Sequence, residues 1–273
     1  MTPALPFKSF NSGLLTIEIH TDRAAMGAAA AVQAAAVLCE ALARRGQARI
    51  ILASAPSQNE LIDGLAAASG IDWSQVTVFH MDEYVGLPAG HGATFRAYQE
   101  ARLLSRVNPA AFHGIRGESA DAAAECARYT ALVREAPIDL VCMGIGENGH
   151  IAFNDPPVAD FEDAAWIKPV ALDGACRLQQ VHDGCFPGLA SVPQHALTLT
   201  CPALMSGMAI VCVVPGLRKA EAVRATVEDP VTTECPATIL RRHPNAVLYL
   251  DRDSAGLLRD QGSIPSKTVN GLL

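Results

Sequence analysis

Short runs of Val, Ile and Leu alternate along the chain with longer stretches in which apolar residues recur at helical spacing. Continuous apolar runs are typical of strands that are buried on both faces, and the longer stretches are typical of helices that cover a sheet. The pattern predicts strands that start at residues Leu15, Ala48, Val76, Ile138, Ala209 and Ala246. It predicts helices near residues 23–45, 57–69, 94–105, 118–135 and 217–228, and a further strand leading into a short helix from His195.

This order predicts an α/β protein: a three-layer, Rossmann-like fold with a mostly parallel central sheet flanked by helices. No internal repeat or low-complexity linker divides the chain, so we expect one domain over residues 15–273 after an N-terminal extension over residues 1–14. In such sheets, ligands bind outside the carboxyl ends of the strands. Polar residues that directly follow apolar runs are therefore the candidates for function, and they form three clusters, at residues 54–58, 82–86 and 144–155.

Charge and composition narrow the class of partner. The formal net charge is −7, and no run of Lys and Arg reaches four residues, which argues against nucleic acid or a membrane surface as the partner. Residues 23–46 are rich in alanine but are interrupted by Gln33, Glu40, Arg44 and Arg45, so a helix covering the sheet is favoured over a transmembrane span. The N-terminus has no signal-peptide pattern and the eight cysteines form no C-x-x-C pair, so we expect a cytoplasmic protein with reduced thiols.

Gly144, Gly146 and Gly149 form a G-x-G-x-x-G pattern after an apolar run, as in dinucleotide-binding turns. That fingerprint also requires a helix that begins in the loop and binds the pyrophosphate. Here Pro156 and Pro157 follow closely, and proline removes an amide donor and restricts the residue before it. We therefore predict no nicotinamide cofactor, and we expect the glycines to shape a turn that a ligand can approach.

Asp82 and Glu83 follow the strand that starts at Val76. Solvated loop charges would be one interpretation of this pair. The alternative is that the apolar strand delivers Asp82 to the rim of a cleft, where partial burial raises the pKa of a carboxyl and suits it to act as a general base. His80 and Asp82 fall on the same strand face, but no third ligand with a characteristic spacing follows, so no metal site is predicted.

His150 lies in the glycine-rich loop instead of on an apolar face. Imidazole is the side chain best suited to proton transfer near neutral pH. Asn148 and Asp155 flank it and could orient the ring and fix its tautomer. The sequence thus predicts a general acid–base histidine with two polar supports.

The segments "FHMDEYVGLP" and "GIGENGHIAFNDP" resemble the glucosamine-6-phosphate deaminase (isomerase/deaminase) family, which is related to the 6-phosphogluconolactonases. The resemblance runs from about Leu15 to beyond "LRRHPNAVLYLDRDSAGLL" and covers most of the chain. It implies that Asp82 moves a proton between C2 and C1 of an amino sugar and that His150 opens the pyranose ring. It gives Asn148 and Asp155 supporting roles, and it implies a reaction without a metal or another cofactor.

The chain departs from the family pattern at several positions. Asn148 stands where many members have Asp, and Asp155 stands where Glu is usual. The phosphate loop, typically Thr-Gly-Gly-Thr-Pro, reads Ser-Ala-Pro-Ser-Gln over residues 54–58. Residues 166–168 also lack an arginine of the allosterically regulated members, so we expect no activation by amino-sugar phosphates.

An anion could still be bound by this altered loop, through the hydroxyls of Ser54 and Ser57, the amides of Ala55, Ser57 and Gln58, and the start of the next helix. Lys219 matches the family's phosphate-side lysine, although a solvated helix residue is the competing interpretation. The resemblance makes Arg177 the replacement for the family's usual arginine. The remaining predicted substrate-binding residues are Glu83 and Gly146.

These predictions lead to an aldose–ketose isomerisation with deamination: glucosamine 6-phosphate, or a close analogue, would give fructose 6-phosphate and ammonia. The expected partner is a small-molecule sugar phosphate, and a homo-oligomer is compatible with the resemblance. One alternative is a hydrolase like the 6-phosphogluconolactonases, although their histidine is typically followed by Thr-Ala-Ser-Leu-Phe-Pro, which is missing here. Another is a sugar-phosphate-binding protein with weak or no catalysis.

Overall fold

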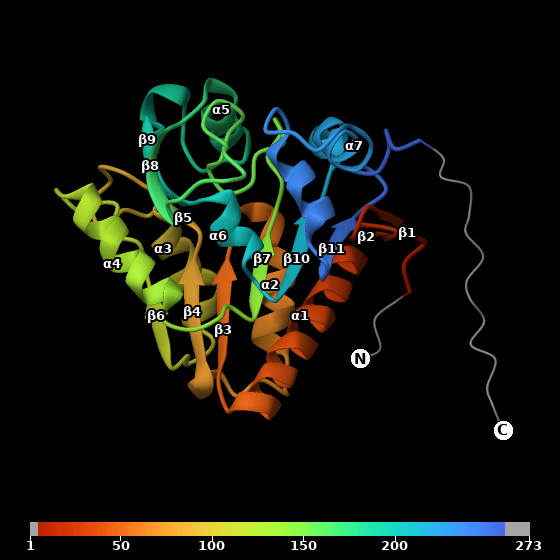
Figure 1. Cartoon of the computed structure of the whole chain (residues 1–273), viewed down its shortest axis with the longest axis horizontal. Helices are drawn as coiled ribbons and strands as arrows, with labels where there is room; N and C mark the ends of the chain where they lie inside the picture. The colour runs from red at the N-terminus through yellow and green to blue at the C-terminus, as the bar shows by residue number, and fades with distance from the viewer. Residues whose placement is uncertain (1–4, 260–273) are drawn as a thin grey trace.

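The computed structural model describes residues 5–259. Residues 1–4 of the predicted N-terminal extension and residues 260–273 of the predicted domain lie outside the described range. Within that range the main sheet has eight strands in the order β1-β2-β11-β10-β7-β3-β4-β6 (Figure 1). All neighbouring pairs are parallel except β1 and β2. The strands are β1 (Lys8–Ser12), β2 (Leu15–Ile19), β3 (Ala48–Leu52), β4 (Val76–His80), β6 (Ala111–His113), β7 (Leu140–Met143), β10 (Ala209–Val214) and β11 (Ala246–Leu250).

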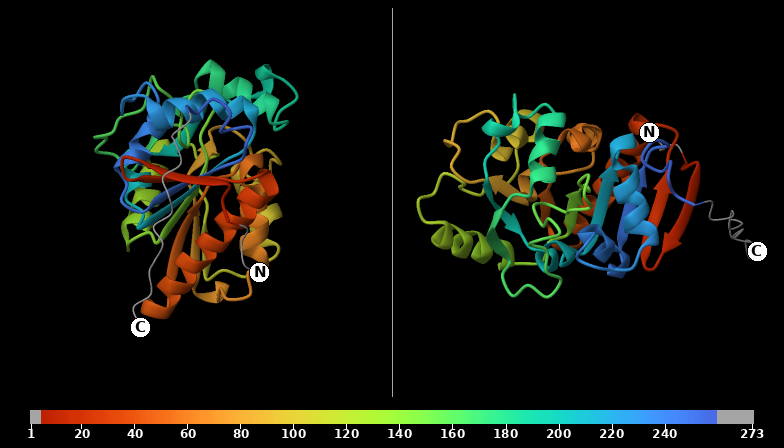
Figure 2. Two further views of the ribbon diagram at one scale, coloured as in Figure 1. Left: turned by 90° about the vertical axis from the view of Figure 1, so that its right-hand side faces the viewer. Right: turned by 90° about the horizontal axis from the view of Figure 1, so that it is seen from above.

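Strand β1 lies within the range predicted as an N-terminal extension. It pairs with β2 along its whole length, from Lys8 opposite Ile19 to Ser12 opposite Leu15. The two strands form one edge of the sheet, drawn in red in Figure 2. The structure therefore adds this strand to the sheet of the predicted domain.

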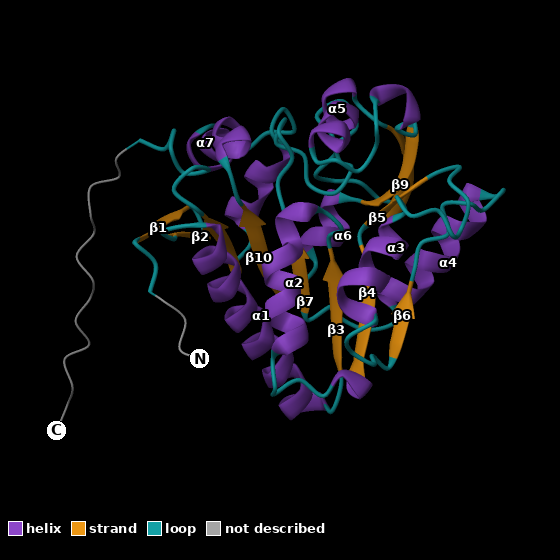
Figure 3. Ribbon diagram, turned by 180° about the vertical axis from the view of Figure 1, so that it is seen from behind, coloured by secondary structure: helices purple, strands orange, loops and turns teal. Residues whose placement is uncertain are grey.

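Helices cover both faces of the main sheet, which confirms the predicted three-layer α/β fold. The helices are α1 (Arg23–Arg45), α2 (Asn59–Ala67), α3 (Phe95–Gln99), α4 (Ala122–Arg134), α5 (Gly174–His182), α6 (Cys201–Met205) and α7 (Ala220–Glu228). Along β3, Ile51 packs in the core layer with α4, α6 and α7, whereas its neighbours Ile50 and Leu52 pack in the layer with α1 and α2 (Figure 3). Alternate side chains of one buried strand thus supply both cores.

A small antiparallel sheet lies above the carboxyl ends of the main strands (Figure 1). It consists of β5 (Asp82–Tyr84), β9 (His195–Leu199) and β8 (Ile167–Ala171), paired in that order. The predicted strand and helix from His195 are confirmed as β9 and α6, whereas β5 and β8 were not predicted. Because β5 follows β4 after one residue, Asp82 stands at the point where the chain passes from one sheet to the other.

Helix α1 has clear sequence signals at both ends. The Asp22 side chain accepts a hydrogen bond from the amide of Ala25, and Gly46 ends the helix at a positive φ of 70°. By length and composition α1 could span a membrane, but it packs against α2 and the main sheet, as the sequence predicted. Helix α2 comes close because Gly27 has no side chain: an added Cβ would lie 2.2 Å from the Cβ of Glu60.

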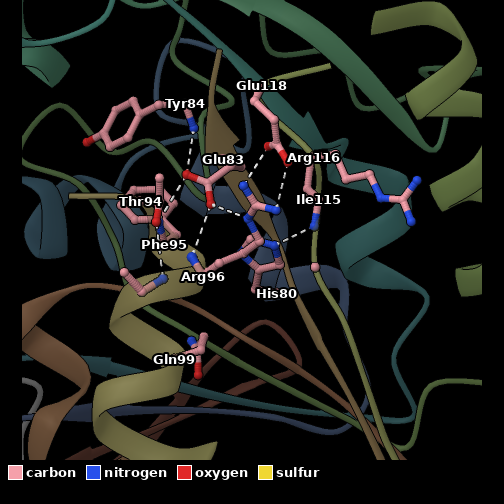
Figure 4. A network of polar contacts seen from close by, with 12 residues as sticks. His80, Glu83, Tyr84, Thr94, Phe95, Arg96, Gln99, Ile115, Arg116 and Glu118 are labelled. Atoms are coloured by element: carbon pink, nitrogen blue, oxygen red, sulfur yellow. Dashed lines mark hydrogen bonds and ion pairs between the residues drawn. The ribbon is translucent and has the colours of Figure 1, made fainter. Parts of the chain in front are cut away.

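A buried polar network fixes the segment between β5 and α3 (Figure 4). The carboxylate of Glu83 is fully buried and accepts hydrogen bonds from the amides of Tyr84, Phe95 and Arg96, each at 3.0 Å. The guanidinium of Arg96 lies 3.7 Å from Glu83 through Nε and donates to Glu118 on its outer side. Burial raises the pKa of Glu83 to about 7, although the three amides and Arg96 favour the charged form.

We predict that Gly27→Ala destabilises the protein. In a helix interior, alanine stabilises the helix by about 1 kcal/mol relative to glycine. Overpacking a tight contact, however, destabilises the protein by about 1–3 kcal/mol. Urea unfolding should therefore give a lower free energy of unfolding. The matched control is Gly174→Ala in α5, where an added Cβ meets nothing within 4 Å and stability should be unchanged or higher. Equal behaviour of the two variants would contradict the packing argument.

We predict that Glu83→Gln removes a pH dependence of stability. A carboxyl with an ordinary pKa of 4.5 and a folded-state pKa of about 7 adds roughly 3 kcal/mol, fully present below pH 4.5 and lost as the pH rises through 7. In urea unfolding, the free energy of unfolding of the wild type should therefore fall relative to that of the variant by about this amount as the pH rises from 5 to 8.

Glu118→Gln is the control for this experiment. Burial opposes ionisation of Glu118, but the hydrogen bond from Arg96 outweighs it and lowers the pKa of Glu118 below 4.5. This carboxylate therefore stays ionised from pH 5 to 8 in the folded and the unfolded protein. Its removal should not change how the free energy of unfolding depends on pH. A constant difference between wild type and Glu83→Gln would show that Glu83 is ionised throughout.

Candidate active site

A pocket opens at the carboxyl ends of β3, β4, β7 and β10, and α5 contributes one of its walls. Each of the three polar clusters identified in the sequence contributes to the lining. The predicted site residues that line it are Ser54, Ala55, Ser57, Gln58, Asp82, Gly146, His150 and Lys219. Asp82 and His150, which lie far apart in the sequence, therefore face one cavity.

The imidazole of His150 is held by two acceptors. Its Nδ1 lies 2.7 Å from Oδ1 of Asn148 and 2.9 Å from Oδ1 of Asp155. Because both facing atoms are acceptors, Nδ1 carries the proton in the neutral ring, and Nε2 keeps its lone pair for a ligand. The ring also packs against Gly146, where an added Cβ would lie 2.1 Å from Cε1.

Asn148 and Asp155 support His150 from outside the pocket lining. Nδ2 of Asn148 donates to Asp155 Oδ1 at 3.0 Å, which links the two supports to each other. Burial opposes ionisation of Asp155, but hydrogen bonds from His150 and Asn148 outweigh it and lower the pKa of Asp155. The Asp155 side chain therefore reaches the imidazole, although it is shorter than the Glu that is usual at this position in the family. It remains the anionic partner of His150.

Asp82 is 6% exposed and starts β5. Burial raises its pKa well above the ordinary value, and the adjacent charge of Glu83 raises it further. Such a carboxyl binds a proton more strongly than one in water, which suits proton abstraction from carbon. Phe95 and Phe153 also line the pocket, so part of its wall is apolar.

The loop at residues 54–58 keeps its shape without glycine. Ser54 Oγ accepts a hydrogen bond from Gln99 at 2.9 Å, and the buried Gln58 side chain donates to Met143 O at the end of β7. The backbone N–H of Gln58 donates a hydrogen bond to the carbonyl oxygen of Ala55 at 2.9 Å. This backbone N–H is therefore already hydrogen-bonded within the loop, which does not support the prediction that it binds an anion.

Lys219 follows β10 through a sharp turn at Gly216, which has a positive φ of 89°. The carboxylate of Asp251 accepts the Gly216 amide at 2.9 and 3.0 Å and fixes this turn. The Lys219 side chain is 8% exposed and lines the pocket, so it is not a solvated helix residue. Burial lowers its pKa, and the carboxylates of Asp183 and Glu147 oppose that change.

Two predicted substrate-binding residues do not line the pocket. Arg177 lies on α5, where its guanidinium donates to the carbonyls of Leu189 and Val192 at 2.8 and 2.9 Å. Glu83, the next residue after Asp82, lies in the buried polar network of Figure 4. Arg177 supports the chain after α5, and Glu83 affects the site through the electrostatics of Asp82.

Two places in the described residues bring together side chains of metal-binding types: His80 near Asp82, and the cluster of His150, Asp155 and Cys176. His80 Nε2 accepts a hydrogen bond from the Ile115 amide at 2.7 Å, so this nitrogen is not free to bind a metal, and burial lowers the pKa of His80 to about 3. Candidate ligand atoms of His150, Asp155 and Cys176 lie within 4.8 Å of one another. However, the first two are hydrogen-bonded to each other, and burial raises the pKa of the Cys176 thiol well above its ordinary value, which disfavours the thiolate that a metal needs.

Sequence reasoning missed several polar residues of the lining: Arg23 at the start of α1, and Gln179, Gln180 and Asp183 at the end of α5. Helix α5 was not predicted because its segment is polar. Asp173, which caps it, was an available signal. The helix is held by a small core around Tyr84 and Phe186, which only the folded chain assembles.

The chain is similar to known proteins over most of its length. The family model described as glucosamine-6-phosphate isomerases/6-phosphogluconolactonase matches residues 21–249. The glucosamine-6-phosphate deaminase of Exiguobacterium sibiricum is 37% identical over 70% of this chain and 74% of its own. That of Pseudarthrobacter chlorophenolicus is 35% identical over 83% of this chain and 87% of its own.

Solved structures place the same fold in both branches of the family. A monomeric glucosamine-6-phosphate deaminase is similar with a TM-score of 0.80 and 27% identity, over 88% of this chain and 99% of that one. The 6-phosphogluconolactonase of Trypanosoma brucei has a TM-score of 0.73 at 14% identity, over 92% and 100% of the two chains, which shows the fold alone. The chain belongs to the family of glucosamine-6-phosphate isomerases and 6-phosphogluconolactonases, as its two motifs indicated.

Proposed function

We propose that this enzyme converts glucosamine 6-phosphate, or a close analogue, to fructose 6-phosphate and ammonia. The observation that carries the proposal is that Asp82 and His150 line one pocket together with the buried Lys219. A base, an acid–base imidazole and a cation for phosphate are the groups that this reaction requires. The deaminases of Exiguobacterium and Pseudarthrobacter add support through their similarity.

In the first step, His150 would exchange a proton with the ring oxygen and open the pyranose. Its Nε2 is the nitrogen that remains for the ligand, since Nδ1 faces Asn148 and Asp155. The anionic Asp155 stabilises the imidazolium that forms when the ring takes up a proton. This pairing lets one histidine both accept and return a proton.

In the second step, Asp82 would take the proton from C2 of the open-chain sugar and return it to C1. The C2–H bond breaks, a C1–H bond forms, and the carbonyl character moves from C1 to C2. The nitrogen at C2 is then an imine, and water replaces it with release of ammonia. The raised pKa of Asp82 supports its role as the base, because it strengthens the carboxylate as a proton acceptor.

The phosphate would lie toward Lys219 and the loop at residues 54–58. Lys219 is buried in the pocket, and the hydroxyl of Ser57 lies near the ends of β7 and β10: an added Cβ at Gly144 would be 3.4 Å from Ser57 Oγ and 3.3 Å from Val213 O. A lysine binds phosphate as a point charge, and hydroxyls add directional contacts. A cytoplasmic location and a sugar phosphate as the only required partner complete the proposal.

We predict that Asp82→Asn lowers kcat for ammonia release from glucosamine 6-phosphate by about 10²–10⁴-fold, because a positioned base contributes that much. KM should change little, since the amide keeps the shape of the carboxyl. His150→Gln should lower kcat as well. If Asp82→Asn kept full activity on a phosphorylated lactone while His150→Gln lost it, the hydrolase alternative would replace this proposal. Binding of hexosamine phosphates without turnover by the wild type would favour a binding protein.

We predict that activity falls as the pH is lowered through the pKa of Asp82, because only the ionised carboxylate can accept a proton. Asp82→Asn cannot titrate at this position, so its residual activity should lose this acid limb of kcat/KM. Glu118→Gln, on the outer side of Arg96, is the control and should leave the limb in place. An acid limb that stays in place in Asp82→Asn would argue against Asp82 as the titrating base.

A further inference from the structure

Arg23 is a cation of the pocket that the proposed reaction has not yet used. It is the first residue of α1 and lines the pocket beside the loop at residues 54–58. Its Nε donates to Glu60 at 2.7 Å and its Nη2 donates to the carbonyl of Pro56. Nη1 has no partner among residues 5–259, and the side chain is 42% exposed. A guanidinium has five N–H donors, so at least two remain available to a ligand.

The rest of the pocket has few donors for a phosphate dianion. Pro56 has no amide hydrogen, and the amide of Gln58 is bonded to Ala55 O. Arg177, expected to supply a guanidinium, donates to carbonyls outside the pocket lining. Of the arginines and lysines among residues 5–259, only Arg23 and Lys219 line the pocket, and Asp183 lies close enough to Lys219 to offset part of its charge.

The fold holds Arg23 in place from three sides. Asp22 caps α1 and so fixes the position of its first residue. Gly27 allows α2 to approach closely, which brings Glu60 within reach of the guanidinium. The contact with Pro56 O then ties the same group to the loop. An arginine held by two contacts loses little further conformational freedom when it binds an anion.

We propose that Arg23 binds the substrate's phosphate group, so that a guanidinium from α1 replaces donors that the altered loop lacks. This inference rests on the proposed function for the identity of the substrate, but phosphate binding can be measured without turnover. Arg23 is then a specificity-determining residue: it selects phosphorylated over unphosphorylated amino sugars. Bidentate contact by Arg, in place of the point charge of Lys, would also fix the orientation of the phosphate.

The test compares Arg23→Gln and Arg23→Lys with Arg44→Gln, an exposed arginine farther along the same helix that pairs with Glu40. Calorimetry should show that Arg23→Gln weakens binding of inorganic phosphate and of glucosamine 6-phosphate by roughly 10- to 100-fold, the range for a charge-assisted hydrogen bond. Arg23→Lys should recover part of this loss, and Arg44→Gln should match the wild type. In kinetics, KM should rise and kcat should change little.

Other outcomes separate this inference from the proposed function. If Arg23→Gln binds phosphate like the wild type but unfolds at a lower temperature, Arg23 only braces the loop and the inference is wrong. If the wild type releases no ammonia, yet Arg23→Gln still weakens phosphate binding, the inference stands and the proposed reaction fails. Equal loss of binding for glucosamine and glucosamine 6-phosphate would also overturn it, because the contact would not be with the phosphate.

Discussion

The parallel, in-register pairing of the central strands is the constraint on which the rest of the structure depends. Leu52 of β3 pairs with Cys142 of β7 and with His80 of β4, and Cys212 of β10 pairs with Met143. These strands are buried on both faces, so a one-residue shift of register would exchange the side chains that pack in the two cores. The residues that follow the four strands therefore meet at one edge, and the pocket forms between them.

Burial at this edge determines the chemistry that each polar group can perform. Asp82 is shielded from water and lies beside Glu83, which favours its protonated form. Asp155 is equally buried, but hydrogen bonds from His150 and Asn148 keep it anionic. Two buried carboxyls of the site thus have pKa values shifted in opposite directions because their neighbours differ. The difference suits one to accept a proton from carbon and the other to support an imidazolium.

The sequence predicted the parts of the fold that are set by local pattern. The long apolar strands, the capped α1 and the position of His150 in a glycine-rich loop each have signals within a few residues, and the structure confirms these elements. The position of Arg177 could not be predicted, because it depends on how α5 turns toward Leu189 and Val192. Arg23 was missed for the opposite reason: at the start of a helix it looks like a solvated residue, and only the close packing of α1 and α2 brings it to the loop.

The proposed function requires that one carboxylate, of Asp82, and one imidazole, of His150, move protons of the same sugar. It is tested most directly by NMR of the fructose 6-phosphate formed from glucosamine 6-phosphate in D₂O. In the wild type, C1 of the product should carry the hydrogen taken from C2, or deuterium where the proton on Asp82 exchanges with the solvent before it is returned, and Asp82→Asn should form product only very slowly. Labelled product from Asp82→Asn at the wild-type rate, or unlabelled product when transfer to solvent is shown to be fast, would contradict it.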